Sequence, residues 1–214
     1  MYICFINTNF LSIMAFSDYK TLESVQAKYP QIVVQTGDII PTNLALFEVN
    51  PYLEREIKFN LQTYRSNEYY ATEALISPIL REVWRKHIDQ INMWTHQTIR
   101  YDDDLTGLPD FMFTKLEKKQ YKILSYPILT TVEAKAENFV EGWSQCIVQM
   151  LACQKLNNKP NITVFGIVTT GKQWEFGKLE DNIIIINSIS CGIDNLPKLM
   201  AILDYLLSEA KKQL

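Results

Sequence analysis

A run near the middle of the chain, ILTTVEAKA at residues 128–136, combines strong strand-forming character with two charges. Its β-branched and apolar residues are typical of a strand inside a sheet. Alternation places Thr131, Glu133 and Lys135 on one face and the even-numbered residues on the other. A carboxylate and an ammonium group in such surroundings need partners, because moving a charge out of water is costly. The run therefore predicts a sheet with a polar cluster built into it.

The composition is that of one globular domain. The chain has 214 residues, of which 47% are hydrophobic and 21% charged, so a core of ordinary size is expected. We expect a main domain at residues 61–214 and an N-terminal appendage at 1–60, in which 1–13 form an upstream extension if the chain starts at Met14. The net charge of −3 excludes a highly basic protein that coats nucleic acid, but it allows a locally basic site.

Cysteine usage and hydropathy indicate a cytoplasmic protein without a membrane partner. Four cysteines without CxxC spacing argue against a zinc site and a disulfide scaffold, and favour reduced thiols. The longest apolar runs are far shorter than the ~20 residues of a membrane span. The apolar N-terminus has no Lys or Arg before Lys20, so it lacks the charged region of a signal peptide.

Hydrophobic periodicity predicts an α/β chain with a mixed central sheet flanked by helices. The strongest helical pattern covers 67–88 and contains Pro78, where we expect a kink or a broken turn. The region 31–60 shows only β-like pieces. The other expected helices are 17–29 with Ser17 as N-cap, 138–157 with an asparagine C-cap, and 196–214. The expected strands are 97–103, 108–116, 122–136, 162–170, 172–179 and 182–189.

Pro109-Asp110 opens the strand expected at 108–116. If this strand pairs with the next one, Asp110 meets Glu133 on the same face of the sheet. Two carboxylates with open coordination sites bind a hard divalent cation, here Mg²⁺ or Mn²⁺. Lys135 beside them is placed to activate a water molecule or to neutralise a developing oxyanion. An ordinary ion pair between Glu133 and Lys135 on a solvated sheet face is the alternative.

The pattern Pro109-Asp110 followed by Glu133-x-Lys135 resembles the PD-(D/E)XK nuclease superfamily, also called restriction-endonuclease-like. The superfamily core of helix, three strands, helix and strand is similar to the order expected over residues 67–170. Within the superfamily, the chain looks most similar to the N-terminal nuclease domains of type I restriction subunits and to stand-alone bacterial relatives. In these, a helix reading like NExxxxELLIxPLL precedes the strands, and residues 67–80 are similar.

The resemblance implies metal-dependent cleavage, with Asp110 and Glu133 as metal ligands and Lys135 supporting the nucleophile. It also implies a further acid from the helix at 67–88, for which we prefer Glu73 and hold Glu68 in reserve.

Two other polar positions receive an expectation. Gln149 shares a helix face with Gln145 and is similar to a glutamine that orients the site in some branches of the superfamily, while a polar pair on the solvent side is the alternative. His87 and His96 are expected as a helix-end cation and a loop or strand residue, and not as catalytic bases.

Charge placement separately favours a nucleic-acid partner. Residues 109–160 carry a net charge of +2 and the remaining residues −5. The hairpin expected at 115–122 holds four lysines that we assign to phosphate contact, with a solubilising hairpin tip as the alternative: Lys115, Lys118, Lys119 and Lys122.

The sequence therefore predicts a nuclease that hydrolyses phosphodiester bonds, with DNA as the favoured substrate and a homodimer as the expected assembly. The first alternative is a catalytically silent nuclease-fold protein that binds nucleic acid or a protein partner. The second is a small hydrolase that acts on another phosphoester. The intact set of two acids and a lysine favours the enzyme.

Overall fold

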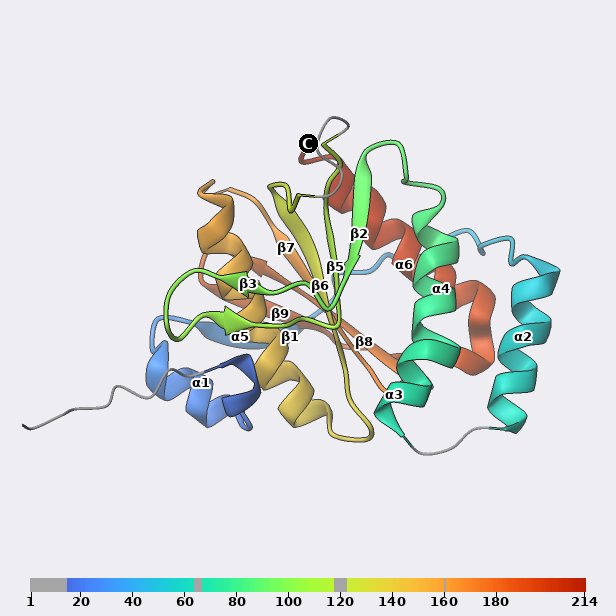
Figure 1. Ribbon diagram of the computed structural model, residues 1–214, viewed down its shortest axis with the longest axis horizontal. Coiled ribbons are helices and arrows are strands. Elements are labelled where there is room, and N and C mark those ends of the chain that lie inside the picture. The colour runs from blue at the N-terminus through green and yellow to red at the C-terminus, as the bar shows by residue number, and fades with distance from the viewer. Residues whose placement is uncertain (1–14, 64–66, 118–122, 160) are drawn as a thin grey trace, which may run out of the picture.

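A mixed β-sheet runs through the centre of the protein, and helices cover both of its faces (Figure 1). The computed structural model describes residues 15–63, 67–117, 123–159 and 161–214. The strand order is β1-β9-β8-β7-β6-β5-β2, and β10 pairs with β8. The pairs β1–β9 and β6–β7 are parallel and the others antiparallel. The expected mixed α/β class is confirmed.

The elements alternate along the chain. The strands are β1 (Val33–Gly37), β2 (Ile91–Thr95), β3 (Ile99–Arg100), β4 (Thr106–Gly107), β5 (Phe111–Lys115), β6 (Ile128–Ala134), β7 (Val164–Thr169), β8 (Gln173–Glu180), β9 (Ile183–Asn187) and β10 (Cys191–Gly192). The helices are η1 (Phe16–Asp18), α1 (Leu22–Lys28), α2 (Pro51–Gln62), α3 (Glu68–Ala71), the π-turn η2 (Thr72–Ile76), α4 (Ser77–Trp84), α5 (Phe139–Asn157), η3 (Ile193–Asn195) and α6 (Leu196–Lys211).

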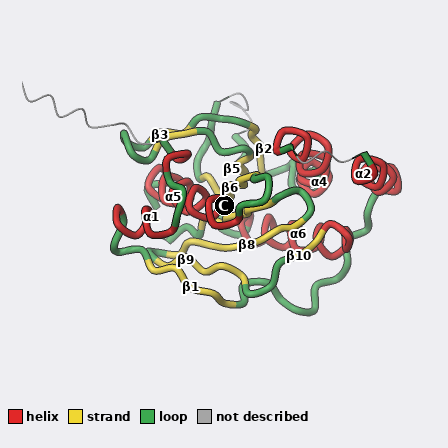
Figure 2. The backbone as a smooth tube through the Cα atoms, turned by 90° about the horizontal axis from the view of Figure 1, so that it is seen from below, coloured by secondary structure: helices red, strands yellow, loops and turns green. Residues whose placement is uncertain are grey.

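Two apolar cores lie on opposite faces of the sheet, so the protein has three layers (Figure 2). Helices α5 and α1 with η1 cover one face, and α2, α4 and α6 cover the other (Figure 1). In the described residues, no helix is long and apolar enough to cross a lipid bilayer.

Strand β6 has the predicted alternation in its second half. Val132 and Ala134 face the core under α4 and α6, while Thr131 and Glu133 face α5. Earlier in the strand the register with β5 shifts by one residue, because Phe113 pairs with Thr130 but the next residue pairs with Ile128. Such a bulge changes which face a side chain occupies, and it lies upstream of the charged residues.

The helix expected at 67–88 is interrupted before Pro78, as its sequence indicates. Asn67 caps α3, the π-turn η2 follows, and α4 then carries Pro78 in its first turn. Proline has no N–H to donate to the carbonyl four residues back. The Asn60 side chain supplies the missing donor, with its Nδ2 at 2.8 Å from the Ala74 oxygen. The break therefore keeps its backbone hydrogen bonds satisfied.

The N-terminal segment is part of the main sheet and cores, which differs from the expected appendage at 1–60. Strand β1 pairs with β9, and Phe16, Tyr19 and Val25 are buried under α5. Helix α2, with an Asn50 cap followed by proline at the first helical position, lies in a region where the sequence predicts only β-like pieces. The upstream extension at 1–13 lies outside the described residues.

Two other boundaries differ from expectation. Thr21, not Ser17, caps α1, because the chain first makes the short turn η1. The strand expected at 97–103 is the two-residue β3 of a separate hairpin with β4, and the sheet partner of β5 is the earlier strand β2. Helix α5 matches its prediction, and its C-cap Asn158 adopts the left-handed conformation.

We predict that Phe16→Ala lowers the free energy of unfolding by about 3 kcal/mol, the cost of truncating a buried aromatic residue. Phe16 is 2% exposed. Val33→Ala is the control in the same segment, because Val33 is 53% exposed and should change stability by less than about 0.5 kcal/mol. Equal effects of the two substitutions in urea unfolding would contradict the placement of this segment in the core.

Candidate active site

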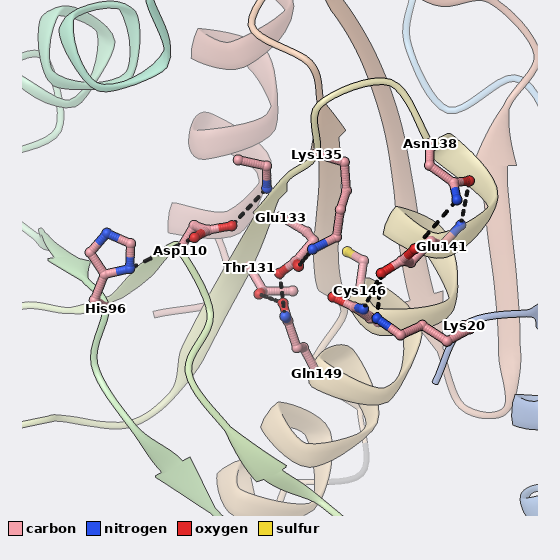
Figure 3. A network of polar contacts seen from close by, with 12 residues as sticks. Lys20, His96, Asp110, Thr131, Glu133, Lys135, Asn138, Glu141, Cys146 and Gln149 are labelled. Atoms are coloured by element: carbon pink, nitrogen blue, oxygen red, sulfur yellow. Dashed lines mark hydrogen bonds and ion pairs between the residues drawn. The ribbon is translucent and has the colours of Figure 1, made fainter. Parts of the chain in front are cut away.

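The antiparallel pairing of β5 with β6 brings the two predicted carboxylates together. Phe111 pairs with Val132, so Asp110, just before β5, comes beside Glu133 at the carboxyl end of β6 (Figure 3). The Asp110 Oδ2 atom accepts a hydrogen bond of 2.8 Å from the backbone N–H of Ala134. This bond ties the acidic side chain to the strand that carries its partner.

Lys135 joins the pair from the next position on that face. Its Nζ atom lies 2.8 Å from Glu133 Oε1, and the two side chains are 16% and 6% exposed. The Lys135 backbone N–H donates to the Thr169 carbonyl of β7 at 2.9 Å, which fixes the chain where β6 ends. The ammonium group thus lies over the carboxylate at the carboxyl end of β6, and not on a freely solvated face.

A glutamine from α5 completes the contacts of Glu133. Gln149 donates from Nε2 to Glu133 Oε2 at 2.6 Å, and its own Oε1 accepts from the Thr131 hydroxyl at 2.5 Å. Both bonds are buried, and together they fix the orientation of the amide. Gln145 turns elsewhere and donates to Glu141 Oε1 at 3.1 Å.

Burial raises the pKa values of both carboxyl groups, and the charge of Asp110 adds to the effect at Glu133. Burial is the larger cause for Glu133, followed by the nearby charge of Asp110, and its pKa rises to about 7 against the opposing effect of Lys135. Burial also raises the pKa of Asp110 to about 6, although the Ala134 N–H and Lys135 act to lower it. One ammonium group therefore does not compensate two buried carboxylates, and the site favours an added positive charge.

Of the two acids considered in the helical segment, the structure brings Glu68 and not the preferred Glu73 close to the site. Burial is the larger influence on Asp110 and Lys135, but the charge of Glu68 also raises the pKa values of both. Glu73 is exposed and lines a shallow groove between α2 and α4 with Tyr52 and Arg81. The resemblance places an acid on this helical segment without fixing its position, so it did not separate the two.

The described lysine of the expected hairpin, Lys115, lies at the opposite end of β5 from this site. Lys115 ends β5 and Asp110 precedes the strand, so roughly 16 Å of strand separates them. Lys115 is exposed there, and Lys118, Lys119 and Lys122 lie outside the described residues, so their assignment to phosphate contact stays a prediction.

Two residues that the sequence analysis did not assign to the site border it in the structure. His96 lies with Nδ1 3.7 Å from Asp110 Oδ1, and its backbone N–H donates to the Asp110 carbonyl at 3.0 Å. Its φ of 46° is in the left-handed region, which non-glycine residues seldom adopt. Lys20, from the N-terminal segment, bonds Glu141 Oε1 at 2.6 Å (Figure 3). Neither long-range contact has a sequence signal.

The donor set fits a hard divalent cation that keeps much of its water. In the described residues, no three His, Cys, Asp or Glu side chains converge on one point as a ready-made metal cage. Mg²⁺ needs no such cage, because one or two carboxylates with waters and substrate phosphates commonly hold it. Asp110 and Glu133 are the residues that would hold it here.

Comparison of the chain with protein-family models and with curated proteins finds no match.

The raised pKa values predict that stability falls as pH increases. The folded protein retains protons on these carboxyls that the unfolded chain has released, so ionisation between about pH 4.5 and 7 costs folding free energy. In EDTA, the free energy of unfolding of the wild type should fall between pH 5 and 8, and Glu133→Gln should make this fall smaller by on the order of 3 kcal/mol. Urea unfolding at each pH measures it.

Glu141→Gln is the matched control, because the Lys20 hydrogen bond lowers the pKa of Glu141. The stability that ionised Glu141 contributes is complete above about pH 4.5 and is lost only at lower pH. The control should therefore follow wild type between pH 5 and 8. If the free energy of unfolding changed with pH equally in wild type and in Glu133→Gln, burial would not be raising the pKa of Glu133.

Proposed function

We propose that the protein is a metal-dependent nuclease with a restriction-endonuclease-like core, and that it hydrolyses nucleic-acid phosphodiester bonds, with DNA as the favoured substrate. The observation that carries the proposal is the buried Asp110–Glu133 pair at a strand end, under-compensated by the single charge of Lys135. A purely structural ion pair between Glu133 and Lys135 would not need Asp110 beside it, because the charge of Asp110 raises the pKa of Glu133.

Each residue then has a defined role. Asp110 and Glu133 would hold a divalent ion, which would polarise the phosphoryl oxygen and make a water molecule more acidic. Lys135 donates from Nζ to the attacking water or to a non-bridging phosphate oxygen, where negative charge develops. Gln149 donates to Glu133 Oε2 and fixes the orientation of that carboxylate.

The remaining parts of the proposal are the partners and the location. A symmetric homodimer suits an enzyme that cuts both strands of a duplex. The described cysteines, Cys146, Cys153 and Cys191, are buried free thiols, which supports a reducing compartment such as the cytoplasm.

We predict that Mn²⁺ or Mg²⁺ binds and stabilises the protein. Ligand at a hundredfold excess over Kd adds about 2.7 kcal/mol to the free energy of unfolding, so the melting temperature should rise by several degrees. Binding should also release protons, because the carboxyl pKa values lie near neutral pH. Calorimetry in two buffers of different ionisation enthalpy measures both effects.

Substitution of single acids tests the assignment. Asp110→Asn should abolish the Mn²⁺ stabilisation, and Glu73→Gln should leave it unchanged. Glu68→Gln should alter affinity modestly, because its charge reaches the site without a direct bond to Asp110 or Glu133 among the described contacts. An unchanged wild-type melting curve in millimolar Mn²⁺ argues against the metal site.

A second prediction separates catalysis from binding at Lys135. An ammonium group has only donors and is not a metal ligand. Lys135→Met, which keeps most of the stem, should retain the fold, Mn²⁺ binding and most nucleic-acid affinity. Turnover should fall by roughly 10²–10³, the usual loss for one preorganised electrostatic group. Cleavage of plasmid, single-stranded DNA and RNA with Mn²⁺, paired with binding in Ca²⁺, measures the two properties.

Unchanged cleavage by Lys135→Met would refute this mechanism. Binding of nucleic acid by wild type without cleavage of any substrate would instead favour the catalytically silent alternative.

A further inference from the structure

A cavity of about 390 Å³ lies between α6 and the two chain segments that follow β1 and β9. Ala201 and Ile202 of α6 line it and are themselves buried. Ile40 and Leu44, from the segment after β1, add further apolar surface. Sites for small organic molecules in proteins have volumes of roughly 300–1,000 Å³ and mostly apolar walls. This cavity therefore has the size and the lining of such a site.

The cavity lies away from the candidate active site. Strands β1 and β9 are parallel neighbours at the edge of the sheet that is opposite β2 (Figure 2). Their carboxyl ends lead into the segments that line the cavity, and ligands of α/β sheets commonly bind outside such ends. Strands β7 and β8 lie between β9 and β6, so roughly 14 Å of sheet separates β9 from β6. The cavity also lies against α6, whereas Glu133 faces α5.

The segment 38–46 that borders the cavity is tied down at both ends. Near its start, the Ile39 N–H donates to the side-chain oxygen of Asn187, the last residue of β9, at 2.9 Å. Just after its end, the Phe47 N–H donates to the Pro197 carbonyl of α6 at 3.2 Å, and the Phe47 side chain is buried in the core. These two anchors join the segment to the strand and to the helix between which it runs, so the cavity is a fixed part of the fold.

The cavity combines apolar surface with one uncompensated positive charge. Leu46 and Ile189 line it and are 68% and 62% exposed, so a bound molecule would remove much of this apolar surface from water. The charged residues of the lining are Asp38 and Lys198. The Ser188 hydroxyl donates to the Asp38 carboxylate. In the described part of the chain, no acidic side chain forms an ion pair with the Lys198 ammonium group.

We infer that this cavity binds a small organic anion, with its carboxylate on Lys198 and its apolar body against Ile40 and Ala201. An apolar cavity of about 150 Å³ takes up benzene, so the present one has room for a body of more than twice that volume. The positive charge favours a carboxylate over a neutral or cationic head group, and the limited volume favours a small molecule over a segment of a partner protein. The inference does not depend on the proposed nuclease function, because it uses none of the residues of the candidate active site.

Calorimetric titration of the full chain tests the inference with three probes of one chain length: octanoate, octan-1-ol and octylammonium. Octanoate should bind most tightly. Lys198→Met, which keeps most of the side-chain stem, should weaken octanoate binding roughly tenfold, a typical loss for a hydrogen bond to a charged group, and should leave octan-1-ol binding nearly unchanged. Lys198→Glu should reverse the preference, so that octylammonium binds more tightly than octanoate.

Lys58→Met on α2 is the matched control, because Lys58 is also an exposed helical lysine and lies outside the cavity. Its titration curves should equal those of the wild type. Ala201→Phe should fill the cavity and abolish binding of all three probes, and melting curves check that this variant is folded. The double substitution Leu46→Ala/Ile189→Ala changes only exposed side chains, and it should weaken the binding of all three probes without disturbing the core.

Absence of octanoate binding to the wild type at millimolar concentration overturns the inference. Equal affinity of the wild type for octanoate and octan-1-ol also overturns it, as does equal octanoate affinity in Lys198→Met and Lys58→Met. Octanoate binding that persists in folded Ala201→Phe would place the site outside the cavity. None of these results affects the proposed function, which depends on Mn²⁺ binding and on cleavage at Asp110, Glu133 and Lys135.

Discussion

The pairing of two buried carboxylates against one ammonium group is the constraint on which this end of the sheet depends. Asp110, Glu133 and Lys135 meet where β5 begins and β6 ends. The Ala134 N–H donates to Asp110, and the Lys135 ammonium group pairs with Glu133. From α5, Gln149 donates to one carboxylate oxygen of Glu133, and the Thr131 hydroxyl donates to Gln149 and orients it. The raised carboxyl pKa values show that these contacts do not fully offset the burial. Residual strain of this kind is common where a protein prepares a site for a ligand.

Distant segments converge at the same place, and the sheet order explains why. Because β7 runs parallel to β6, its turn at Gly171 lies at the carboxyl end of β6, and α3 packs on that turn. The N-terminal segment covers α5 from the other side and brings Lys20 to Glu141. Segments from both faces of the sheet thus lie at this end of it, although only one face holds the charged cluster.

The sequence predicted those parts of the molecule that depend on local pattern. Alternation in β6 put Glu133 and Lys135 on one face, and helical spacing marked α5 with its asparagine C-cap. Contacts between distant segments had no such signal, so the sheet role of β1 and the approach of His96 to Asp110 were missed. The preference for Glu73 over Glu68 had no local signal behind it, because which acid of a helical segment lies near a site depends on how that segment packs. The count of charges also could not show that Lys115 lies at the far end of β5 from Asp110.

Lys135 would have two opposing effects on the proposed metal site. Its Nζ lies 2.8 Å from Oε1 of Glu133, one of the two carboxylates proposed to hold the ion. A cation bound by this pair would compete with Lys135 for the carboxylate, so the ammonium group would lower the metal affinity. The same competition would loosen the ion pair when a cation binds, and the ammonium group would then be free to donate to a phosphate oxygen. Under the proposed function, the ion pair that stabilises the metal-free protein would thus link cation binding to the release of the group assigned to the substrate.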